Sequence, residues 1–306
     1  MEDYLIGDLV RRLRKQRGLT QEELADGILS KTNLSRLETG GQLPRKDTLE
    51  AILQRLGFNS HDNYNYFLNE REFEISKKSN DLLSLLANNR NQEADALINE
   101  LSLLPEFKNG IKAQFLLLCR AVVMVNLRLN NDELREIVLK ALKITFPSFS
   151  EKYISKYFLS DQEVRLVNIL SITYLNENKV DKAIEILEKL KEALDSAKID
   201  DKQRSELYTL ILYNLSKYYG LSKRYIESIK ICDFGRELCL KTNKMRHLPG
   251  LIYNKAYCLY EIGYRDECIP LLYQAYYGYI MLGDRLRRDI IKNHAKEKHG
   301  LDFDKK

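Results

Sequence analysis

The chain has 306 residues and a formal net charge of +5, with 44% hydrophobic and 30% charged residues. This length allows two domains that each bury a core, and the mild positive charge permits an anionic partner without requiring one. No membrane span is predicted, because the longest apolar stretch, residues 113–129, is interrupted by Arg120 and falls short of the roughly 20 apolar residues that cross a bilayer.

Cysteine and histidine usage predicts neither disulfides nor a metal site. The cysteines are odd in number and lack CxxC spacing, so we expect reduced thiols in helix cores. They are Cys119, Cys232, Cys239, Cys258 and Cys268. Among the scattered histidines only His294 and His299 are near each other, in a charged tail, and no metal or cofactor is predicted. The acidic N-terminus lacks the apolar core of a signal peptide, which predicts a cytoplasmic protein.

Helical spacing of apolar residues recurs along the chain, whereas strand-like alternation is nearly absent and glycine and proline are sparse. We therefore predict an all-α protein. Short helices with tight turns precede Gly57, a polar stretch with Asn and Tyr follows, and longer paired helices begin near Ser76. The predicted segments are an N-terminal domain at 1–58, a linker helix at 59–75 and a repeat domain at 76–306.

The N-terminal domain begins with two predicted helices. The first has a single apolar stripe, formed by Ile6, Leu9, Val10 and Leu13. Gly18 ends this helix. Thr20 and Glu23 then form a capping box, which starts a second helix from Gln21 to about Gly27.

Two further helices complete this domain. Ser30 caps a third helix, Lys31 to about Glu38, which buries Leu34 and Leu37. A fourth helix follows Pro44. Its apolar stripe consists of Leu49, Ile52, Leu53 and Leu56.

The outer face of the third helix carries short and medium hydrogen-bonding side chains. They are Lys31, Thr32, Asn33, Ser35 and Arg36. Such side chains at the start of an exposed helix suit base edges in a major groove, and Arg36 is long enough for a bidentate contact to guanine. The N-terminus of the second helix, at Gln21, suits a backbone phosphate. The alternative is a solvated polar face without a partner.

The same segments resemble the lambda-repressor-like (XRE) family of helix-turn-helix DNA-binding domains. The resemblance covers almost all of residues 4–57 and rests on Leu19-Thr-Gln-Glu-Glu-Leu-Ala25, Leu34-Ser-Arg-Leu-Glu38, Gly40 and Pro44. It implies that Gln21 contacts a phosphate and that Lys31, Thr32 and Arg36 read bases. It also implies that Arg14 and Glu38 form a structural ion pair between the first and third helices.

Two departures from that pattern bear on function. Gly41 stands where many relatives carry a lysine near the phosphates, so one backbone contact is expected to be missing. The turn between the second and third helices is one residue shorter than in phage repressors. This shorter turn resembles that of peptide-pheromone regulators of the PlcR and Rgg type.

The charge of the N-terminal domain predicts a dimer. Residues 1–58 hold 10 Lys or Arg and 9 Asp or Glu, and the cations cluster at Arg11, Arg12, Arg14, Lys15 and Arg17, and at Arg45 and Lys46. We include Arg45 and Lys46 among the predicted DNA-binding residues. Because phosphate neutralisation supplies much of the affinity for DNA, a nearly neutral domain should bind weakly alone. A homodimer on a two-part operator is therefore expected.

The second half of the chain contains a recurring helix pair. Tyr213 and Asn214 recur 40 residues later as Tyr253 and Asn254, and the small residue Ser228 recurs as Cys268. Earlier, weaker units are centred on Ala183, Ala94 and the region of Glu136, which gives a spacing of about 40 to 47 residues. The pattern resembles tetratricopeptide (TPR) repeats and predicts a right-handed α-solenoid. A generic helical bundle is the alternative.

The tetratricopeptide pattern places the first helix of each pair on a concave face. The residues predicted there, as peptide-binding residues, are Asn168, Tyr213, Asn214, Lys217, Tyr253, Asn254 and Tyr257. Asparagine can donate to and accept from the backbone of an extended peptide, and tyrosines supply apolar walls. The alternative is that these residues hold adjacent repeats together.

The tail carries a basic amphipathic stretch, Arg285 to Lys298, which is predicted to form a helix that caps the last repeat. A second contact to DNA is the alternative. Pro270 falls within the second helix of the last unit, so that helix either starts late or is kinked.

The two halves together resemble the RRNPP group of Gram-positive quorum-sensing regulators. The resemblance implies a cytoplasmic homodimer that binds operator DNA and is controlled by a short signalling peptide in the groove of the repeats. No catalytic constellation is found, so no enzymatic activity is predicted. Two alternatives remain: repeats that bind a partner protein, and a regulator that inhibits another protein while its helix-turn-helix is silent.

Overall fold

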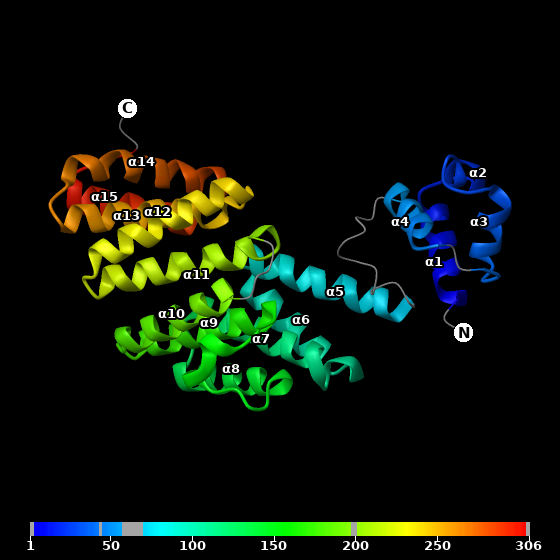
Figure 1. Cartoon of the computed structure of the whole chain (residues 1–306), viewed down its shortest axis with the longest axis horizontal. Helices are drawn as coiled ribbons and strands as arrows, with labels where there is room; N and C mark the ends of the chain where they lie inside the picture. The colour runs from blue at the N-terminus through cyan, green and yellow to red at the C-terminus, as the bar shows by residue number, and fades with distance from the viewer. Residues whose placement is uncertain (1–2, 43–44, 57–69, 197–200, 304–306) are drawn as a thin grey trace. The chain divides into compact units, whose positions relative to one another are not determined.

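The computed structural model describes residues 3–42, 45–56, 70–196 and 201–303, which are helical without any strand. The chain divides into two compact units, residues 1–90 and 91–306. Figure 1 labels the helices of both units. Those of the first unit are α1 (Asp3–Gln16), α2 (Gln21–Ala25), α3 (Lys31–Glu38), α4 (Lys46–Arg55) and α5 (Glu70–Ala87).

The N-terminal helices form as the sequence predicts. The Thr20–Glu23 capping box is present, and Ser30 accepts a hydrogen bond from the backbone of Asn33. The apolar stripes of α1 to α4 meet in one core of buried side chains, namely Leu9, Val10, Leu13, Leu24, Ala25, Leu34, Leu37, Leu49, Ile52 and Leu56. The side chain of Leu53 lies outside the described residues.

Helix α2 ends earlier than predicted, at Ala25, because Gly27 adopts a left-handed φ of 67° in the turn to α3. Arg55 from α4 donates through Nη1 to the carbonyl oxygens of Leu24 and Asp26. This side chain satisfies carbonyls that the end of a helix leaves without intrahelical partners.

The second unit consists of antiparallel helix pairs. Its helices are α6 (Asn91–Ser102), α7 (Gly110–Leu127), α8 (Asn131–Thr145), α9 (Asp161–Asn176), α10 (Val180–Ser196), α11 (Asp201–Leu221), α12 (Tyr225–Thr242), α13 (Leu248–Glu261), α14 (Arg265–Met281) and α15 (Arg285–His299). Short 3-10 helices, Pro105–Phe107, Glu151–Lys156 and Met245–His247, lie between them. The first helices of successive pairs, α7, α9, α11 and α13, also pack against one another. This is the stacking that the repeat pattern predicts.

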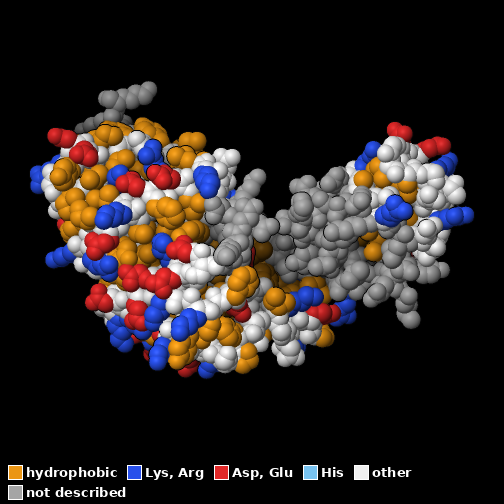
Figure 2. Space-filling model, in the orientation of Figure 1, with side chains coloured by type: hydrophobic (Ala, Val, Ile, Leu, Met, Phe, Trp, Pro, Cys, Tyr) orange, Lys and Arg blue, Asp and Glu red, His pale blue; other side chains and the backbone are white. Residues whose placement is uncertain are grey.

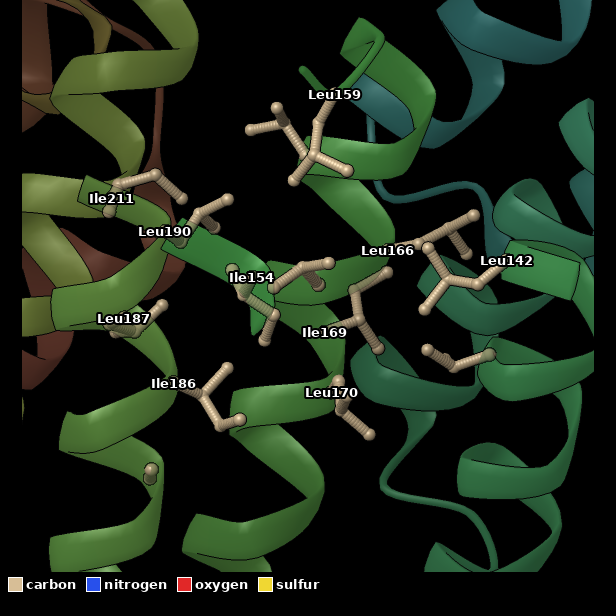
Figure 3. Packing of buried hydrophobic residues seen from close by; sticks show 14 of the residues in the cluster. Leu142, Ile154, Leu159, Leu166, Ile169, Leu170, Ile186, Leu187, Leu190 and Ile211 are labelled. Carbon is tan, nitrogen blue, oxygen red and sulfur yellow. The ribbon is translucent and has the colours of Figure 1, made fainter. Parts of the chain in front are cut away.

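The pairs share continuous cores. In Figure 3, Leu142 of α8, Ile169 and Leu170 of α9, Ile186 of α10 and other apolar side chains interdigitate. The small residues of the repeat pattern are fully buried: Ala94, Ala183, Ser228 and Cys268. Ser228 also donates to the carbonyl oxygen of Ser216 at 2.7 Å, so α11 and α12 lie close together at that point.

Helix α7 is long and apolar enough to cross a membrane by length and composition alone. Its side chains nevertheless pack within the repeat unit, where Leu118, Ala121 and Met124 belong to the core. Gln114 donates to the carbonyl oxygen of Ala141 at 2.9 Å. These contacts are those of a core helix in a stack of helix pairs.

The five cysteines are free and buried, as predicted. Burial raises the pKa of Cys119 and of Cys232 to about 12, and that of Cys239 to about 11. The surface in Figure 2 shows acidic and basic side chains interspersed over the second unit, with apolar side chains gathered toward its C-terminal helices.

The remaining predictions concern Pro270, the C-terminal tail and the linker helix. Pro270 lies inside α14, which begins at Arg265, so the helix does not start late. The tail forms α15, which packs against α14 and buries Ile291 and Ala295, in agreement with a capping helix. The predicted linker helix at 59–75 falls mostly on residues 57–69, outside the described residues.

We expect Gly7→Ala to disrupt the N-terminal core. A Cβ atom at Gly7 would lie 1.9 Å from the carbonyl oxygen of Leu37, so α1 and α3 would have to separate at a cost of about 1–3 kcal/mol. Gly41→Ala is the matched control, because its Cβ would meet Arg36 at ordinary contact distances, 3.5 Å from the carbonyl oxygen and 4.0 Å from Cβ. Hydrogen exchange of α1 and α3 in the full chain should accelerate only in Gly7→Ala; unchanged exchange would contradict this packing.

Candidate functional sites

A buried ion pair joins α1 to α3. Arg14 Nε donates to Glu38 Oε1 at 2.6 Å and Arg14 Nη2 donates to Oε2 at 2.8 Å. Arg14 also donates to the carbonyl oxygen of Leu19, and Gln21 Nε2 donates to Glu38 Oε2 at 2.8 Å. The predicted structural pair is therefore present. It also holds the side chain of Gln21, which was predicted to contact a phosphate.

The environment of Glu38 keeps its carboxylate ionised. Burial alone would raise the pKa of Glu38, but the hydrogen bonds from Arg14 and Gln21 outweigh burial and lower that pKa below its ordinary 4.5. A charged Glu38 can accept from both partners at once. This one carboxylate therefore links α3 to both α1 and α2.

The predicted DNA-reading face of α3 is open to solvent. Lys31, Thr32, Asn33 and Arg36 are exposed and Ser35 is half-buried, while Leu34 and Leu37 face the core. Lys31 lies 3.5 Å from Glu22 in a pair whose members are both well exposed. Such a pair is weak and easily exchanged for a phosphate or a base. Arg45 is exposed as well, and the side chain of Lys46 lies outside the described residues.

The three asparagines of the repeats are buried and bonded to neighbouring repeats. Asn214 Nδ2 donates to Asn168 Oδ1 at 2.8 Å, which links α11 to α9. Asn254 Nδ2 donates to Ser216 Oγ at 2.8 Å and to the carbonyl oxygen of Tyr213 at 3.1 Å, which links α13 to α11. These contacts favour the inter-repeat role that the sequence left open, and a role in clamping a peptide stays a prediction.

The predicted tyrosines and lysine lie on the same side of the first helices. Tyr213 stacks on His247, with ring centroids 6.0 Å apart. Tyr253 and Tyr257 both approach His294 of α15, at 5.6 and 6.1 Å. These tyrosines are half-buried, whereas Lys217 is exposed.

Sequence reasoning missed several residues of this face. His247 precedes α13, and Arg287 and His294 belong to α15, so the repeat pattern did not place them. Arg165 lies on α9 one turn before Asn168, and that spacing could have identified it.

Two family models match the chain. One, described as a helix-turn-helix domain, matches residues 5–63. The other, described as the RNPP family C-terminal domain, matches residues 114–299. Among curated proteins, the transcriptional activator NprA of Geobacillus stearothermophilus is 23% identical over 200 residues, which are 65% of this chain and 45% of that protein. The match to this chain thus spans less than half of NprA.

Solved structures share the fold along nearly the whole chain. A Bacillus thuringiensis PlcR in complex with the peptide PapR7 and DNA matches with a TM-score of 0.69 and 21% identity, covering 95% of this chain and 99% of that one. ComR from S. thermophilus, in complex with DNA and its signalling peptide ComS, matches with a TM-score of 0.57 and 17% identity, covering 97% and 100%. The Streptococcus dysgalactiae SHP pheromone receptor Rgg2 matches with a TM-score of 0.56 and 17% identity, covering 96% and 99%.

We expect Glu38→Gln to weaken the N-terminal domain by about 3 kcal/mol at neutral pH, because it leaves the buried Arg14 guanidinium without a counter-charge. Glu22→Gln removes only an exposed pair and should cost less than about 0.5 kcal/mol. The measurement is urea unfolding, followed through the methyl signals of the buried leucines.

The contribution of Glu38 to the stability of the N-terminal domain should decrease at low pH. Because the folded pKa of Glu38 is lowered, its contribution is fully present above the unfolded value of 4.5 and is lost as the pH falls through the folded pKa. Repeating the titrations below pH 4.5 should therefore narrow the difference between native chain and Glu38→Gln. A difference that does not change with pH would contradict the assignment.

We expect Asn254→Ala to destabilise the repeat domain by about 1–3 kcal/mol, because the hydrogen bonds from its amide to Ser216 Oγ and to the Tyr213 carbonyl oxygen are lost. Asn176→Ala, which removes an exposed bond to Asn131, is the control and should have little effect. Urea unfolding followed by circular dichroism measures both. Native stability combined with lost peptide binding would instead favour a peptide clamp.

Proposed function

The chain belongs to the RNPP family, and we propose that it is a transcriptional regulator whose N-terminal domain binds operator DNA and whose repeats bind a short signalling peptide. The proposal of DNA binding rests on the exposed polar face of the third helix, α3. Its apolar residues are buried, whereas Lys31, Thr32 and Arg36 are exposed to solvent.

The proposed DNA contact follows from the geometry of α2 and α3. The hydrogen-bonding side chains of α3 lie on one exposed face, as a helix in a major groove requires. Arg36 suits guanine through a bidentate contact. Asn33, Ser35, Arg45 and Lys46 are proposed to add base and phosphate contacts. Gln21 lies at the N-terminus of α2, where backbone N–H groups favour a phosphate.

The peptide-binding half is supported by the face that carries Tyr213, Lys217, Tyr253 and Tyr257. These side chains come from α11 and α13, the first helices of adjacent pairs. The solved PlcR and ComR complexes of similar fold contain both DNA and a peptide. We propose that Asn168, Asn214 and Asn254 set the spacing of this face and add backbone contacts to the peptide.

We further propose that the protein acts as a homodimer in the cytoplasm and is not an enzyme. The nearly balanced charge of residues 1–58 supports the dimer, because a domain with few excess cations gains little from phosphate contacts alone. In a dimer, two copies of α3 would bind one operator, which doubles the number of protein–DNA contacts. Sedimentation of the full chain with and without DNA tests this part.

We expect Lys31→Ala combined with Arg36→Ala to weaken binding to the DNA upstream of the protein's own reading frame by at least about 30-fold, since each base contact contributes about 1–3 kcal/mol. Both side chains are exposed, so folding should be retained. Lys140→Ala, which removes an exposed lysine of α8, is the control. Fluorescence anisotropy at about 0.15 M salt measures affinity. Unchanged binding by the double variant would reject α3 as the reading helix.

A further inference from the structure

The capping helix α15 is held on the last helix pair by few buried side chains. Ile291 and Ala295 are its buried residues, whereas its other apolar side chains, Leu286 and Ile290, are more than half exposed. A helix that buries little apolar surface can separate from its neighbours at a small cost in free energy. The polar groups in the contact can therefore decide whether α15 stays docked.

Two histidines of α15 fill much of this contact. His294 lies against Tyr253 and Tyr257 of α13, with ring centroids 5.6 and 6.1 Å apart. His299 lies against Tyr260 of α13 at 4.5 Å, and the two histidine rings are 5.9 Å apart. The facing tyrosines are uncharged at physiological pH, since burial raises the pKa of Tyr253 to about 12 and also raises that of Tyr257. Both imidazoles thus belong to the interface that docks α15.

The nitrogen atoms of both imidazoles suit a neutral ring. His294 Nδ1 is buried and has no hydrogen-bond partner among the described residues. His299 Nδ1 lies 3.7 Å from Sγ of Cys268 on α14, a thiol that keeps its proton because burial raises its pKa. In the neutral tautomer with its proton on Nε2, the first Nδ1 has no N–H to satisfy and the second accepts from the thiol. Protonation adds an N–H at both positions, and neither then has a good acceptor.

Burial disfavours a positive charge on either ring. It is the largest cause that lowers the pKa of His294 and of His299 below the ordinary 6.5. Arg265 of α14 lowers the pKa of His299 further. The same guanidinium lies over the ring of Tyr260, 5.3 Å from its centroid, so that ring already has a cation on one face.

The remaining charged groups near His294 do not reverse this direction. Lys298, on the same helix, and a protonated His299 would each repel a charge on His294. The carboxylates of Glu261 on α13 and Glu297 on α15 favour that charge, yet the pKa of His294 is still lowered. Both histidines are therefore neutral in the docked helix at pH 7.

We propose that His294 and His299 form an acid-sensitive latch, which keeps α15 docked on α13 and α14 while both imidazoles are neutral and releases it when they are protonated. Protonation would place two charges in a partly buried contact and remove the acceptor of the Cys268 thiol. Release would expose Tyr253 and Tyr257, which the docked α15 contacts. The latch needs neither DNA nor peptide, so it goes beyond the proposed function.

The direction of the pH effect follows from the two docked imidazoles. A solvated histidine of the released helix has the ordinary pKa of 6.5, and that of each docked histidine is lower. The released helix therefore binds protons more readily than the docked one. Docking is unaffected well above pH 6.5 and weakens as the pH falls below 6.5.

Hydrogen exchange of the full chain tests the latch. The protection of α15 is divided by that of α9, a core helix of the same chain, so that the effect of pH on intrinsic exchange cancels. We expect this ratio to fall at least about fivefold between about pH 7.5 and about pH 5.5, where a solvated imidazole is protonated about 90% of the time. His247 does not contribute over this range, because its pKa is lowered to about 3.

Variants assign the effect to the two histidines. The double variant His294→Phe with His299→Phe keeps rings in the contact but cannot bind protons, so its ratio should not change with pH. Glu297→Gln, which removes an exposed carboxylate of α15, is the control and should show the fall of the native chain. A constant ratio in the native chain, or an equal fall in the double variant, would overturn the latch.

A second measurement decides the matter if the double variant leaves α15 unprotected even at pH 7.5. The imidazole signals of the native chain, labelled with ¹³C at histidine, are followed by NMR against pH, and the two that the double variant lacks are His294 and His299. We expect both to titrate with midpoints below 6.5. A midpoint at or above 6.5 for both would show that docking does not disfavour their charge, which would overturn the proposal.

Discussion

The need to satisfy buried amides between repeats governs the second unit. Asn214 on α11 bonds to Asn168 on α9, and Asn254 on α13 bonds back to Ser216 and the Tyr213 carbonyl on α11. A buried donor without a partner is costly, so these bonds fix the rotation and the register of the first helices. Residues one turn away on each helix, such as Lys217 and Tyr257, are thereby brought onto a common face.

In the N-terminal domain a buried charged group, the Glu38 carboxylate, likewise orients neighbouring helices. Glu38 lies on α3, the helix that presents Lys31 and Arg36, and it is held by Arg14 of α1 and Gln21 of α2. The carboxylate that anchors the helix in the core thus orients its outer face as well. Close backbone approach at Gly7 completes the arrangement, since a larger residue would displace α1 from α3.

Local features of the fold could be predicted from the sequence, and features formed between distant segments could not. The capping box at Thr20, the bounds of α3 and the buried small residues Ser228 and Cys268 each depend on a few neighbouring residues or on a repeated spacing. The end of α2 was misplaced, because the turn conformation at Gly27 prevailed over helix continuation. The contacts of Arg55 and His294 depend on which helices meet in space, and no spacing in the sequence encodes that. The asparagines were located by periodicity, but their bonding partners were left open for the same reason.

The burial of the cysteine thiols lowers their reactivity toward oxidants and electrophiles. Burial raises the pKa of Cys119 and Cys232 to about 12, so both thiols are protonated at pH 7. Peroxides and electrophiles attack the thiolate, so these side chains react slowly even where small molecules reach them. Cys119 and Cys232 are therefore expected to act as small apolar core residues, and the register of the first helices depends on the amide bonds between repeats.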